Sequence, residues 1–388
     1  MAALLAVIFA LPALGVGWAM DDYFHRVILL EHPRFRELLG GPWEMFRFFR
    51  GDPNRTGREI DLGVFPWWTD LTIKGEFLQS LTVLTHRLDY VLWPSSPVLM
   101  HAHSLLWLGA AVTAAAVFYR RMLGATWVAG AAALLFALDD ARGATVGFLA
   151  NRNALVAATF GISALIAHDR WRRARAGSSA VLAPLLLAAA LFSKEEGIAT
   201  CAYLAAYGLF ADPFGRRRGC LALAPYAAVV VGWRGLRDSW GYGVRNVGLY
   251  LDPLSDTAQY VSALPERLTV LLLGQWSPVP ADLGVLLPPP LQTWLVVMAL
   301  GFLLIVGAAM MPLLWRDSLA RYFGAGMLFA AVPVCATLPM DRLLTFAGLG
   351  ASGLLAQYWA KVFGEKDVAA QGFWHTLRRV LAWFLVAV

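Results

Sequence analysis

Residues 1–22 read MAALLAVIFALPALGVGWAMDD, an uncharged apolar run that ends in two adjacent aspartates. A run of about twenty apolar residues is long enough to cross a bilayer as a helix. The run has no basic leading segment and no small-x-small cleavage pattern, so it is predicted to be a retained anchor and not a signal peptide. Ionisable residues at the end of a membrane helix are costly and often functional. Asp21 and Asp22 are therefore candidate functional residues, with a simple helix end as the alternative.

Two adjacent carboxylates repel each other. One of them is therefore expected to be partly protonated, or both to be offset by nearby cations. His25 and Arg26 follow within about one helical turn. These two residues are the candidate cations and are counted as supporting residues of the site.

The composition is that of a polytopic membrane protein. Mean hydropathy is +0.59, and of the 388 residues 59% are apolar and only 15% are charged, which lies outside the range of soluble globular domains. Near-continuous apolar runs occur at 2–20, 102–119, 123–138, 148–167, 180–193, 198–211, 219–233, 291–311, 322–338 and 343–360. A last run begins near Val380 and stops at Val388, so the chain is expected to end within a helix, with a C-terminal portion missing.

Basic residues collect in alternate connectors between these runs. Arg120-Arg121, the stretch 170–175 and Arg216-Arg217-Arg218 are examples, and this alternation is the positive-inside pattern of cytoplasmic loops. The net charge of +6 is therefore assigned to membrane topology and not to nucleic-acid binding. The alternation places Met1 in the cytoplasm and the Asp21-Asp22 pair on the far side.

Further ionisable residues are predicted to lie on that same far side of the membrane. They are Asp139-Asp140, Asn151-Arg152-Asn153, Lys194-Glu195 and Asp341-Arg342. An arginine just inside a membrane helix must find an anion or a carbonyl, or extend outward. Arg152 paired with Asp139 or Asp140, and Lys194 paired with Glu195, are the structural alternatives. Several such sites on one side indicate a polar cavity at the outer leaflet.

Two longer segments are expected to be outer loops of a single membrane domain that covers residues 1–388. The first, 21–100, mixes aromatic and basic residues, which suits helices lying in the headgroup layer, with a helix expected over 72–93. The second, 234–290, contains an amphipathic segment at 258–274. The expected fold class is therefore an all-α polytopic membrane protein.

A cavity lined by both acids and bases suits a phosphate-bearing lipid. Arg and Lys would hold the phosphate, with Arg favoured for bidentate contact, and an aspartate would take a proton from an attacking hydroxyl. Cations would stabilise the charge that develops on a phosphate leaving group. The histidines have no convincing metal-ligand spacing with Cys or Asp. No cofactor is expected, and a divalent cation held by the paired acids is the less favoured alternative.

Four short motifs in this order resemble a known family. They are the acidic pair after the first span, the segment from Val146 to Leu155 with Arg152, the Ser193-Lys194-Glu195-Glu196-Gly197 stretch, and the segment from Leu338 to Leu344 with Arg342. Over residues 1–360 the chain resembles membrane glycosyltransferases of the GT-C fold. The likeness is greatest to the branch of protein O-mannosyltransferases and transmembrane-tetratricopeptide O-mannosyltransferases.

The resemblance implies a GT-C-like bundle of about ten to twelve transmembrane helices, with amphipathic helices on its outer face. It implies transfer of a sugar from a polyprenyl-phosphate-linked donor, with inversion and without a metal. Asp21 or Asp22 would be the general base that activates the acceptor hydroxyl. Arg152, Lys194 and Arg342 would bind the donor phosphate. The supporting residues would be His25, Arg26, His103, Asp139, Asp140 and Glu195.

The resemblance also implies partners and a location. The partners would be the lipid-linked donor, membrane lipids and an acceptor that is a glycan, a lipid or a protein, with no nucleic acid. The protein would lie in a bacterial inner membrane, with its active site on the periplasmic side, and would serve glycosylation in the cell envelope.

The chain departs from the family at Phe77-Leu78-Gln79-Ser80-Leu81, where an aromatic-Arg-Pro-Leu sequence is common. A basic residue is therefore missing, and the tetratricopeptide repeats of some relatives are also missing from these residues. Two alternatives follow: a non-catalytic transporter or flippase of lipid-linked glycans, and a degenerate glycosyltransferase that serves as a scaffold. The charges lie at one surface and no two halves repeat, which favours the enzyme over the transporter.

Overall fold

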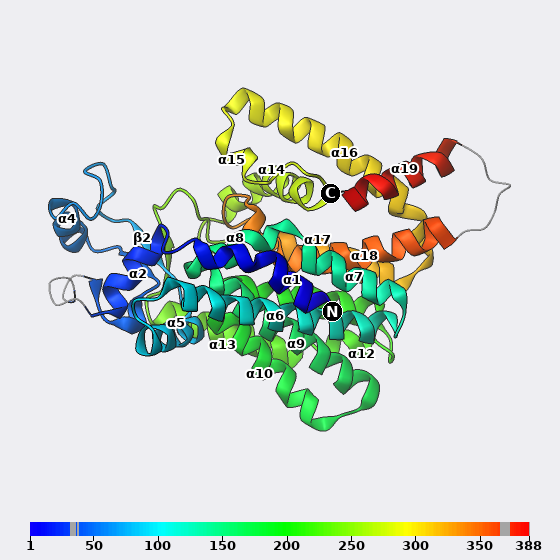
Figure 1. The fold of residues 1–388 in the computed structure, drawn as a ribbon, viewed down its shortest axis with the longest axis horizontal. Coiled ribbons are helices and arrows are strands. Elements are labelled where there is room, and N and C mark those ends of the chain that lie inside the picture. The colour runs from blue at the N-terminus through cyan, green and yellow to red at the C-terminus, as the bar shows by residue number, and fades with distance from the viewer. Residues whose placement is uncertain (32–35, 37–38, 365–372, 388) are drawn as a thin grey trace.

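The apolar runs form helices that pack into a bundle (Figure 1). The computed structural model describes residues 1–387 apart from 32–35, 37–38 and 365–372. The main helices are α1 (Ala2–Ala10), α6 (Pro97–Leu123), α7 (Trp127–Leu138), α9 (Arg152–Ala174), α10 (Gly177–Ser193), α11 (Thr200–Phe210), α12 (Arg216–Leu221), α13 (Ala224–Ser239), α16 (Pro289–Arg316), α17 (Ser318–Val334), α18 (Thr345–Gly364) and α19 (Phe373–Ala387). Helix α9 lies inside the bundle and packs against α6 and α10.

Within the described residues, four helical segments are long and apolar enough to cross a membrane. They are Pro97–Leu123, Leu149–Ala174, Arg216–Ser239 and Pro289–Arg316. Four further apolar helices are shorter: Ala2–Gly15, Trp127–Leu138, Gly177–Ser193 and Ser318–Val334. The helical membrane class is thus supported, whereas the expected ten to twelve spans are not confirmed.

The first expected span, residues 2–20, shows one physical reason why fewer helices than expected are long enough to cross a membrane. Its helix ends at Ala10, and Pro12 introduces a 3-10 turn, Leu11–Gly15. Proline lacks an N–H and cannot continue the hydrogen-bond ladder of an α-helix. Gly17 then adopts a φ of 79°, so the chain has left the helix before Met20. The last expected span, near Val380, lies in α19, except for Val388, which is outside the described residues.

Small residues let α17 and α18 pack closely together. A Cβ atom on Gly350 would lie 2.5 Å from the carbonyl oxygen of Phe323, and one on Gly353 would lie 2.5 Å from the Phe323 ring. The Tyr203 hydroxyl of α11 donates to the carbonyl oxygen of Phe346, at 2.5 Å. Close helix contacts of this kind are typical of membrane bundles. They fix the start of α18, which directly follows the segment that carries Arg342.

The first outer loop contains strands as well as helices. Its elements are α2 (Asp21–Leu29), β1 (Arg47–Arg50), α4 (Pro53–Asp61), β2 (Lys74–Glu76) and α5 (Ser80–Leu92). The expectation of helices alone is therefore wrong, and so is the single helix over 72–93. Residues 74–76 are extended because they pair with strands on both sides, and the helix begins only at Ser80. This loop packs on an apolar cluster of its own, which includes Ile28, Met45 and Phe46.

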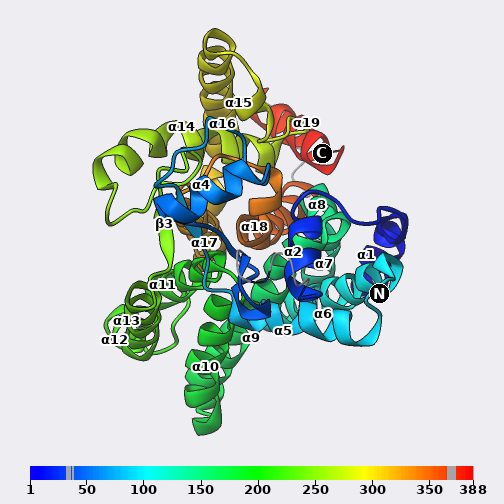
Figure 2. The ribbon, with the colours of Figure 1, turned by 90° about the vertical axis from the view of Figure 1, so that its left-hand side faces the viewer.

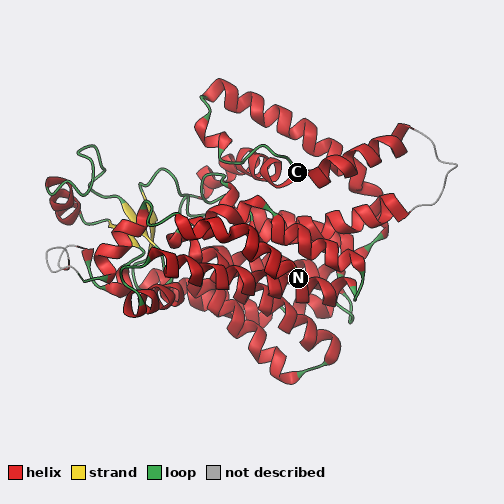
Figure 3. Cartoon of the chain, in the orientation of Figure 1, coloured by secondary structure: helices red, strands yellow, loops and turns green. Residues whose placement is uncertain are grey.

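A small antiparallel sheet joins the two outer loops. Strand β3 (Gly243–Arg245), from the second loop, pairs with β2, so the strand order is β1-β2-β3. Figure 3 shows these strands at one end of the bundle, and Figure 2 views that end with α4 and β3 in front of α17 and α18. The second loop also contains α14 (Thr257–Trp276), which confirms the predicted amphipathic segment, and α15 (Leu283–Leu286).

Candidate functional site

A cavity of about 360 Å³ lies where both outer loops meet the end of the bundle. Its lining comes from segments that are far apart in the chain. The charged and amide residues of the lining are Asp21, Gln79, Asn151, Asn153, Lys194, Glu195, Glu196, Arg234, Arg237, Asp252 and Arg342. The structure therefore brings together several of the residues that sequence analysis singled out, namely Asp21, His25, Lys194, Glu195 and Arg342.

Asp21 is the accessible carboxylate of the cavity. It begins α2 directly after Met20, whose φ of 45° is unusual for a residue with a side chain. Surrounding protein atoms desolvate the carboxylate and raise the pKa of Asp21 above its usual value, while the positive charge of Arg342 opposes this effect. Within the part of the chain that the structure describes, Asp21 is the cavity carboxylate that accepts no hydrogen bond.

Arg342 lies in a short 3-10 turn, Asp341–Leu343, just before α18. Its Nη1 atom donates to the side-chain oxygen of Asn151, at 3.5 Å. This bond is long, and the described residues give Arg342 no salt bridge. The guanidinium can therefore offer its donors to an anion in the cavity, in the fork geometry that suits a phosphate.

Asp22 has a different environment from its neighbour. Its side chain is 3% exposed, does not line the cavity, and accepts hydrogen bonds from the backbone N–H groups of Ala19 at 3.0 Å and Ala150 at 2.8 Å. Burial raises the pKa of Asp22, and these hydrogen bonds oppose the rise. Asp22 therefore links the start of α2 to the turn before α9.

The expected cations beside the acidic pair do not offset it. Arg26 donates to the carbonyl oxygen of Pro94 at 2.6 Å and lies over the ring of Trp18. His25 lines the cavity but is buried among aromatic rings, and burial lowers its pKa to about 3, so its imidazole is neutral. Of the two alternatives for the acidic pair, the structure therefore favours partial protonation over neutralisation by these two residues, since burial raises the pKa of both carboxylates, and the cation that acts on Asp21 is Arg342.

The stretch after α10 contributes three charged residues to the cavity, Lys194, Glu195 and Glu196. Lys194 forms an ion pair with Glu196 at 2.6 Å, and not with Glu195 as sequence analysis suggested. The Glu195 carboxylate accepts from the Leu78 backbone N–H at 3.0 Å and from the Gln79 amide at 2.9 Å. The chain is extended at Lys194 and then forms the 3-10 turn Glu195–Ala199, which points these side chains toward the cavity.

Arg152 does not line the cavity. Its side chain is 0% exposed and pairs with Asp89 of α5 at 2.5 Å, and it donates to the Met100 carbonyl at 2.7 Å and to the Ser104 hydroxyl at 2.9 Å. The expected pairing with Asp139 or Asp140 is therefore wrong. The nearest acid is Asp89, in a helix that was expected to lie apart from the bundle.

His103 belongs to the same buried network. Its Nδ1 atom lies 2.6 Å from Asp89, and its Nε2 atom accepts from the indole N–H of Trp107 at 3.1 Å. The network anchors the start of α9, where Asn151 and Asn153 flank Arg152 and reach into the cavity. Arg152 and His103 thus support the cavity from behind and do not face its contents.

Asp139, Asp140 and Asp341 lie outside the cavity lining. The Asp341 carboxylate accepts from the backbone N–H of Ala281 at 2.8 Å. Burial raises the pKa of Asp341 above its usual value. The Ala281 hydrogen bond opposes this rise, and the nearby charges of Asp282, Asp140 and Asp139 add to it. Among the described residues, no three His, Cys, Asp or Glu side chains are gathered as metal ligands would be.

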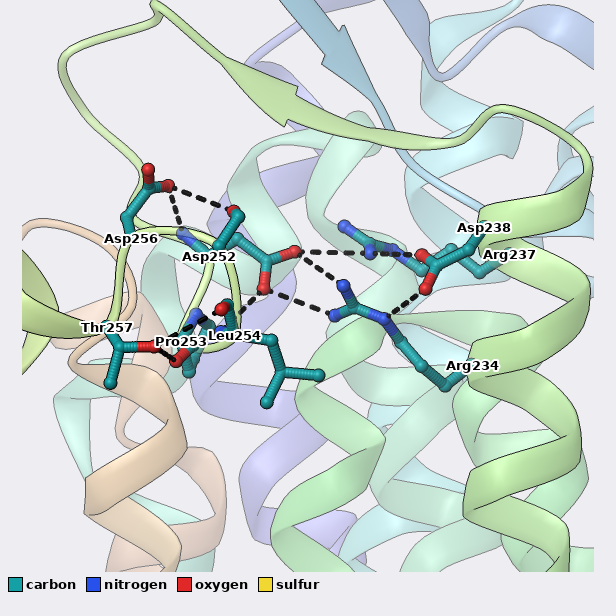
Figure 4. A network of polar contacts seen from close by, with 9 residues as sticks. Arg234, Arg237, Asp238, Asp252, Pro253, Leu254, Asp256 and Thr257 are labelled. Atoms are coloured by element: carbon teal, nitrogen blue, oxygen red, sulfur yellow. Dashed lines mark hydrogen bonds and ion pairs between the residues drawn. The ribbon is translucent and has the colours of Figure 1, made fainter.

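Sequence analysis missed two arginines of the cavity. Helix α13 continues to Ser239, so Arg234 and Arg237 lie one turn apart on it (Figure 4). Asp252 of the second outer loop holds both, with distances of 3.0 Å to Arg234 and 3.4 Å to Arg237. Two arginines three residues apart at the outer end of a span, against the positive-inside pattern, were the signal that could have found them.

The cavity thus has cations and carboxylates in equal number, and most of them are paired with each other. Lys194 is balanced by Glu196, and the two arginines of α13 by Asp252 and by Asp238, which lies 2.8 Å from Arg234. Glu195 is hydrogen-bonded to Leu78 and Gln79, so Asp21 and Arg342 are the carboxylate and the cation that these contacts leave for a ligand. Comparison of this chain with protein-family models, curated proteins and solved structures found no match.

Proposed function

We propose that this protein is a GT-C type membrane glycosyltransferase, which moves a sugar from a polyprenyl-phosphate-linked donor to an acceptor hydroxyl on the periplasmic side. One observation carries the proposal. The Asp21 carboxylate, which accepts no hydrogen bond from the described residues, shares a cavity with the Arg342 guanidinium, whose charge acts on it. This arrangement supports the proposal, because it brings an accessible carboxylate within electrostatic reach of a cation at the end of a membrane bundle.

In the proposed reaction, Asp21 takes the proton of the acceptor hydroxyl as its oxygen attacks the anomeric carbon of the donor sugar. The bond from that carbon to the phosphate oxygen breaks, and the electron pair leaves with the polyprenyl phosphate. Attack from the side opposite to the leaving group inverts the anomeric configuration. The raised pKa of Asp21 makes it a stronger base than an ordinary aspartate.

Arg342 is proposed to bind the phosphate and to stabilise the charge that develops on it as it leaves. Lys194 stands in the same cavity as a second phosphate ligand, although its pairing with Glu196 limits what it can contribute. Arg152 is assigned a positioning role, because its donors are already used within the buried network. The acceptor is a glycan, a lipid or a protein that carries a hydroxyl.

A degenerate glycosyltransferase that serves as a scaffold is the second candidate. The sequence Phe77-Leu78-Gln79 favours the scaffold, because the family that this chain resembles often has a basic residue in this segment. Here the neutral Gln79 side chain lines the cavity instead. Its amide bonds both Glu195 and Asn153, at 2.9 and 2.8 Å. A scaffold or a lipid transporter would bind the donor in this cavity without using Asp21 as a base.

Asp21→Asn separates these candidates. The full-length protein in lipid nanodiscs is incubated with a panel of radiolabelled polyprenyl-phosphate sugars, and transfer and donor binding are measured in parallel. The enzyme proposal expects the variant to lose about 10²- to 10⁴-fold in turnover while still binding the donor. Asp22→Asn is the matched control, and its folded fraction should keep most of its turnover. Equal turnover by Asp21→Asn and the unmodified protein would overturn the proposal.

A further inference from the structure

One wall of the cavity is aromatic. It consists of His25, Phe46, Phe48, Phe77 and Tyr250, which all line the cavity, and we call this set the aromatic wall. Its rings form a continuous series, with centroid distances of 4.9 Å from His25 to Phe46, 5.6 Å from His25 to Phe48, 6.4 Å from Phe48 to Phe77 and 5.3 Å from Phe77 to Tyr250.

His25 is a polar member of the aromatic wall, and its ring nitrogens make no hydrogen bond of good geometry with the described residues, although the Met45 backbone lies near enough to oppose the lowering of its pKa. The residue is 2% exposed, and neither ring nitrogen is satisfied by any described residue. An unpaired buried polar group is costly, so such groups in proteins are usually completed by a ligand or water. Because burial keeps the imidazole neutral, His25 offers one N–H donor and one acceptor nitrogen.

The aromatic wall begins one helical turn from the proposed base. Asp21 and His25 are four residues apart on α2, and residues at this spacing share a helix face. Both line the cavity, as does Arg342. The space bounded by the wall, the Asp21 carboxylate and the Arg342 guanidinium is therefore where a group attached to a bound phosphate would lie.

We propose that the aromatic wall is the subsite for the donor's sugar and that it accepts an uncharged pyranose; this inference rests on the proposed function. A pyranose has apolar C–H faces, which aromatic rings cover well, and hydroxyls that both donate and accept hydrogen bonds. Pockets for such ligands combine aromatic surface with a few well-placed polar groups. His25 supplies one ring nitrogen, as a donor or as an acceptor, to a sugar hydroxyl.

The surrounding charges select against an acidic sugar. A uronic acid in this subsite would bring its carboxylate near Asp21, and like charges in a partly desolvated cavity repel each other. Glu195, for which the described residues provide hydrogen bonds but no cation, lines the same cavity and adds to this repulsion, whereas Glu196 is balanced by Lys194. The wall itself carries no compensating cation, since His25 is neutral.

The test compares lipids that share a farnesyl phosphate and differ in the group esterified to it. Farnesyl phosphate, farnesyl-phosphate mannose and farnesyl-phosphate glucuronic acid are titrated calorimetrically into the full-length protein in nanodiscs. We expect the mannosyl lipid to bind about tenfold more tightly than farnesyl phosphate, which corresponds to about 1.4 kcal/mol, and the glucuronyl lipid to lose this gain. His25→Phe keeps a ring but removes both nitrogens, and Phe48→Leu removes a ring of the wall. Each should reduce the gain about three- to tenfold and leave the affinity for farnesyl phosphate unchanged.

Phe24→Leu is the matched control for Phe48→Leu. Phe24 stacks on Phe48 at 5.3 Å but does not line the cavity, so this change should leave the preference for the mannosyl lipid intact. Thermal melting of each variant establishes that it is folded, and His25→Phe provides a second route if Phe48→Leu melts early.

Three results would overturn the inference. One is equal binding of the mannosyl lipid and farnesyl phosphate by the unmodified protein. Another is equal weakening of both lipids by the wall variants, which would assign the wall to the isoprenoid chain. The third is absence of binding by any of the lipids. The transfer assay distinguishes this inference from the proposed function. A protein that binds the mannosyl lipid through the wall but transfers no sugar would overturn the proposed function and uphold the subsite.

Discussion

Asp21 and Asp22 are adjacent in the chain, yet their carboxylates have different surroundings. Asp22 is buried and receives two backbone N–H groups, whereas Asp21 is accessible and faces the cavity. A helix turns about 100° per residue, so two neighbouring side chains at its start point in different directions. One carboxylate can therefore hold the helix in place while the next is free for chemistry.

The electrostatic link between Asp21 and Arg342 predicts a pH effect. A general base works when deprotonated, so activity should rise with pH through the pKa of Asp21, which lies above its usual 3.8. Arg342→Gln removes the positive charge that favours the carboxylate, so the pKa rises further and the acid limb of the kcat/KM profile moves to higher pH. Turnover should also fall, by about 10²-fold, because a donor to the leaving phosphate is lost.

Arg342→Lys is the control for this prediction. It keeps the charge, so the acid limb should stay near its original pH, while the loss of bidentate geometry lowers turnover. An acid limb that stays in place in Arg342→Gln would show that the charge of Arg342 does not act on the catalytic base.

The buried pair of Arg152 and Asp89 predicts a stability effect. Both side chains are 0% exposed, and removal of one partner from a buried pair leaves an uncompensated charge, which costs about 3–5 kcal/mol. Arg152→Met should therefore lower the melting temperature strongly. The double change Arg152→Met with Asp89→Leu removes both charges and should recover part of that loss. A double variant that melts below Arg152→Met would contradict the pairing.

At the scale of elements, close packing against α10 requires a glycine at position 197 in the turn that follows this helix. A Cβ atom at this position would lie 2.6 Å from both the carbonyl carbon and the carbonyl oxygen of Ala190. Atoms of the backbone cannot yield at that distance without a shift of the helix. The glycine thus lets the 3-10 turn pack on α10 and hold Lys194 and Glu195 at the cavity.

Gly197→Ala should therefore push this turn away from α10. We expect a loss of about 1–3 kcal/mol of stability, as in other overpacked sites, together with reduced turnover because Lys194, Glu195 and Glu196 are displaced. Gly177→Ala, at the other end of α10, is the matched control, since nothing lies within 4 Å of a Cβ atom there. Differential scanning fluorimetry and the transfer assay compare the two, and equal effects would contradict the packing argument.

The helices could be predicted from the sequence because burial in lipid or in the bundle imposes long apolar runs. The sheet could not, since its strands are only three or four residues long and β2 pairs with β3 from a loop that follows much later in the chain. Strands this short have no periodicity to detect. The partner of Arg152 was missed for a related reason: Asp89 lies in a helix that packs on the bundle through tertiary contacts alone.

At the scale of the whole molecule, the two ends of the bundle differ in charge and in structure. The outer loops, the sheet and the cavity occupy one end (Figure 1). The basic connectors lie away from this end. Arg121 pairs there with Asp169 at 2.5 Å, and Arg172 pairs with Asp212 at 2.7 Å. Because sidedness follows from where basic residues collect, the sequence could predict that Asp21, Lys194, Glu195 and Arg342 lie at one end of the bundle. It could not predict that Asp22 and Arg152 turn away from the cavity, because individual contacts depend on how the loops close over the bundle.

This asymmetry predicts how the protein sits in the membrane. Basic connectors stay in the cytoplasm, so the cavity should face the opposite compartment. Asn54→Cys on α4 and Ser178→Cys on α10 place exposed thiols at the two ends, in a background where Cys201, Cys220 and Cys335 are replaced by alanine or serine. In intact spheroplasts a membrane-impermeant maleimide should label Asn54→Cys and spare Ser178→Cys until the membrane is permeabilised. The opposite pattern would place Asp21 and Arg342 in the cytoplasm, and a donor presented on the periplasmic leaflet could then not reach them.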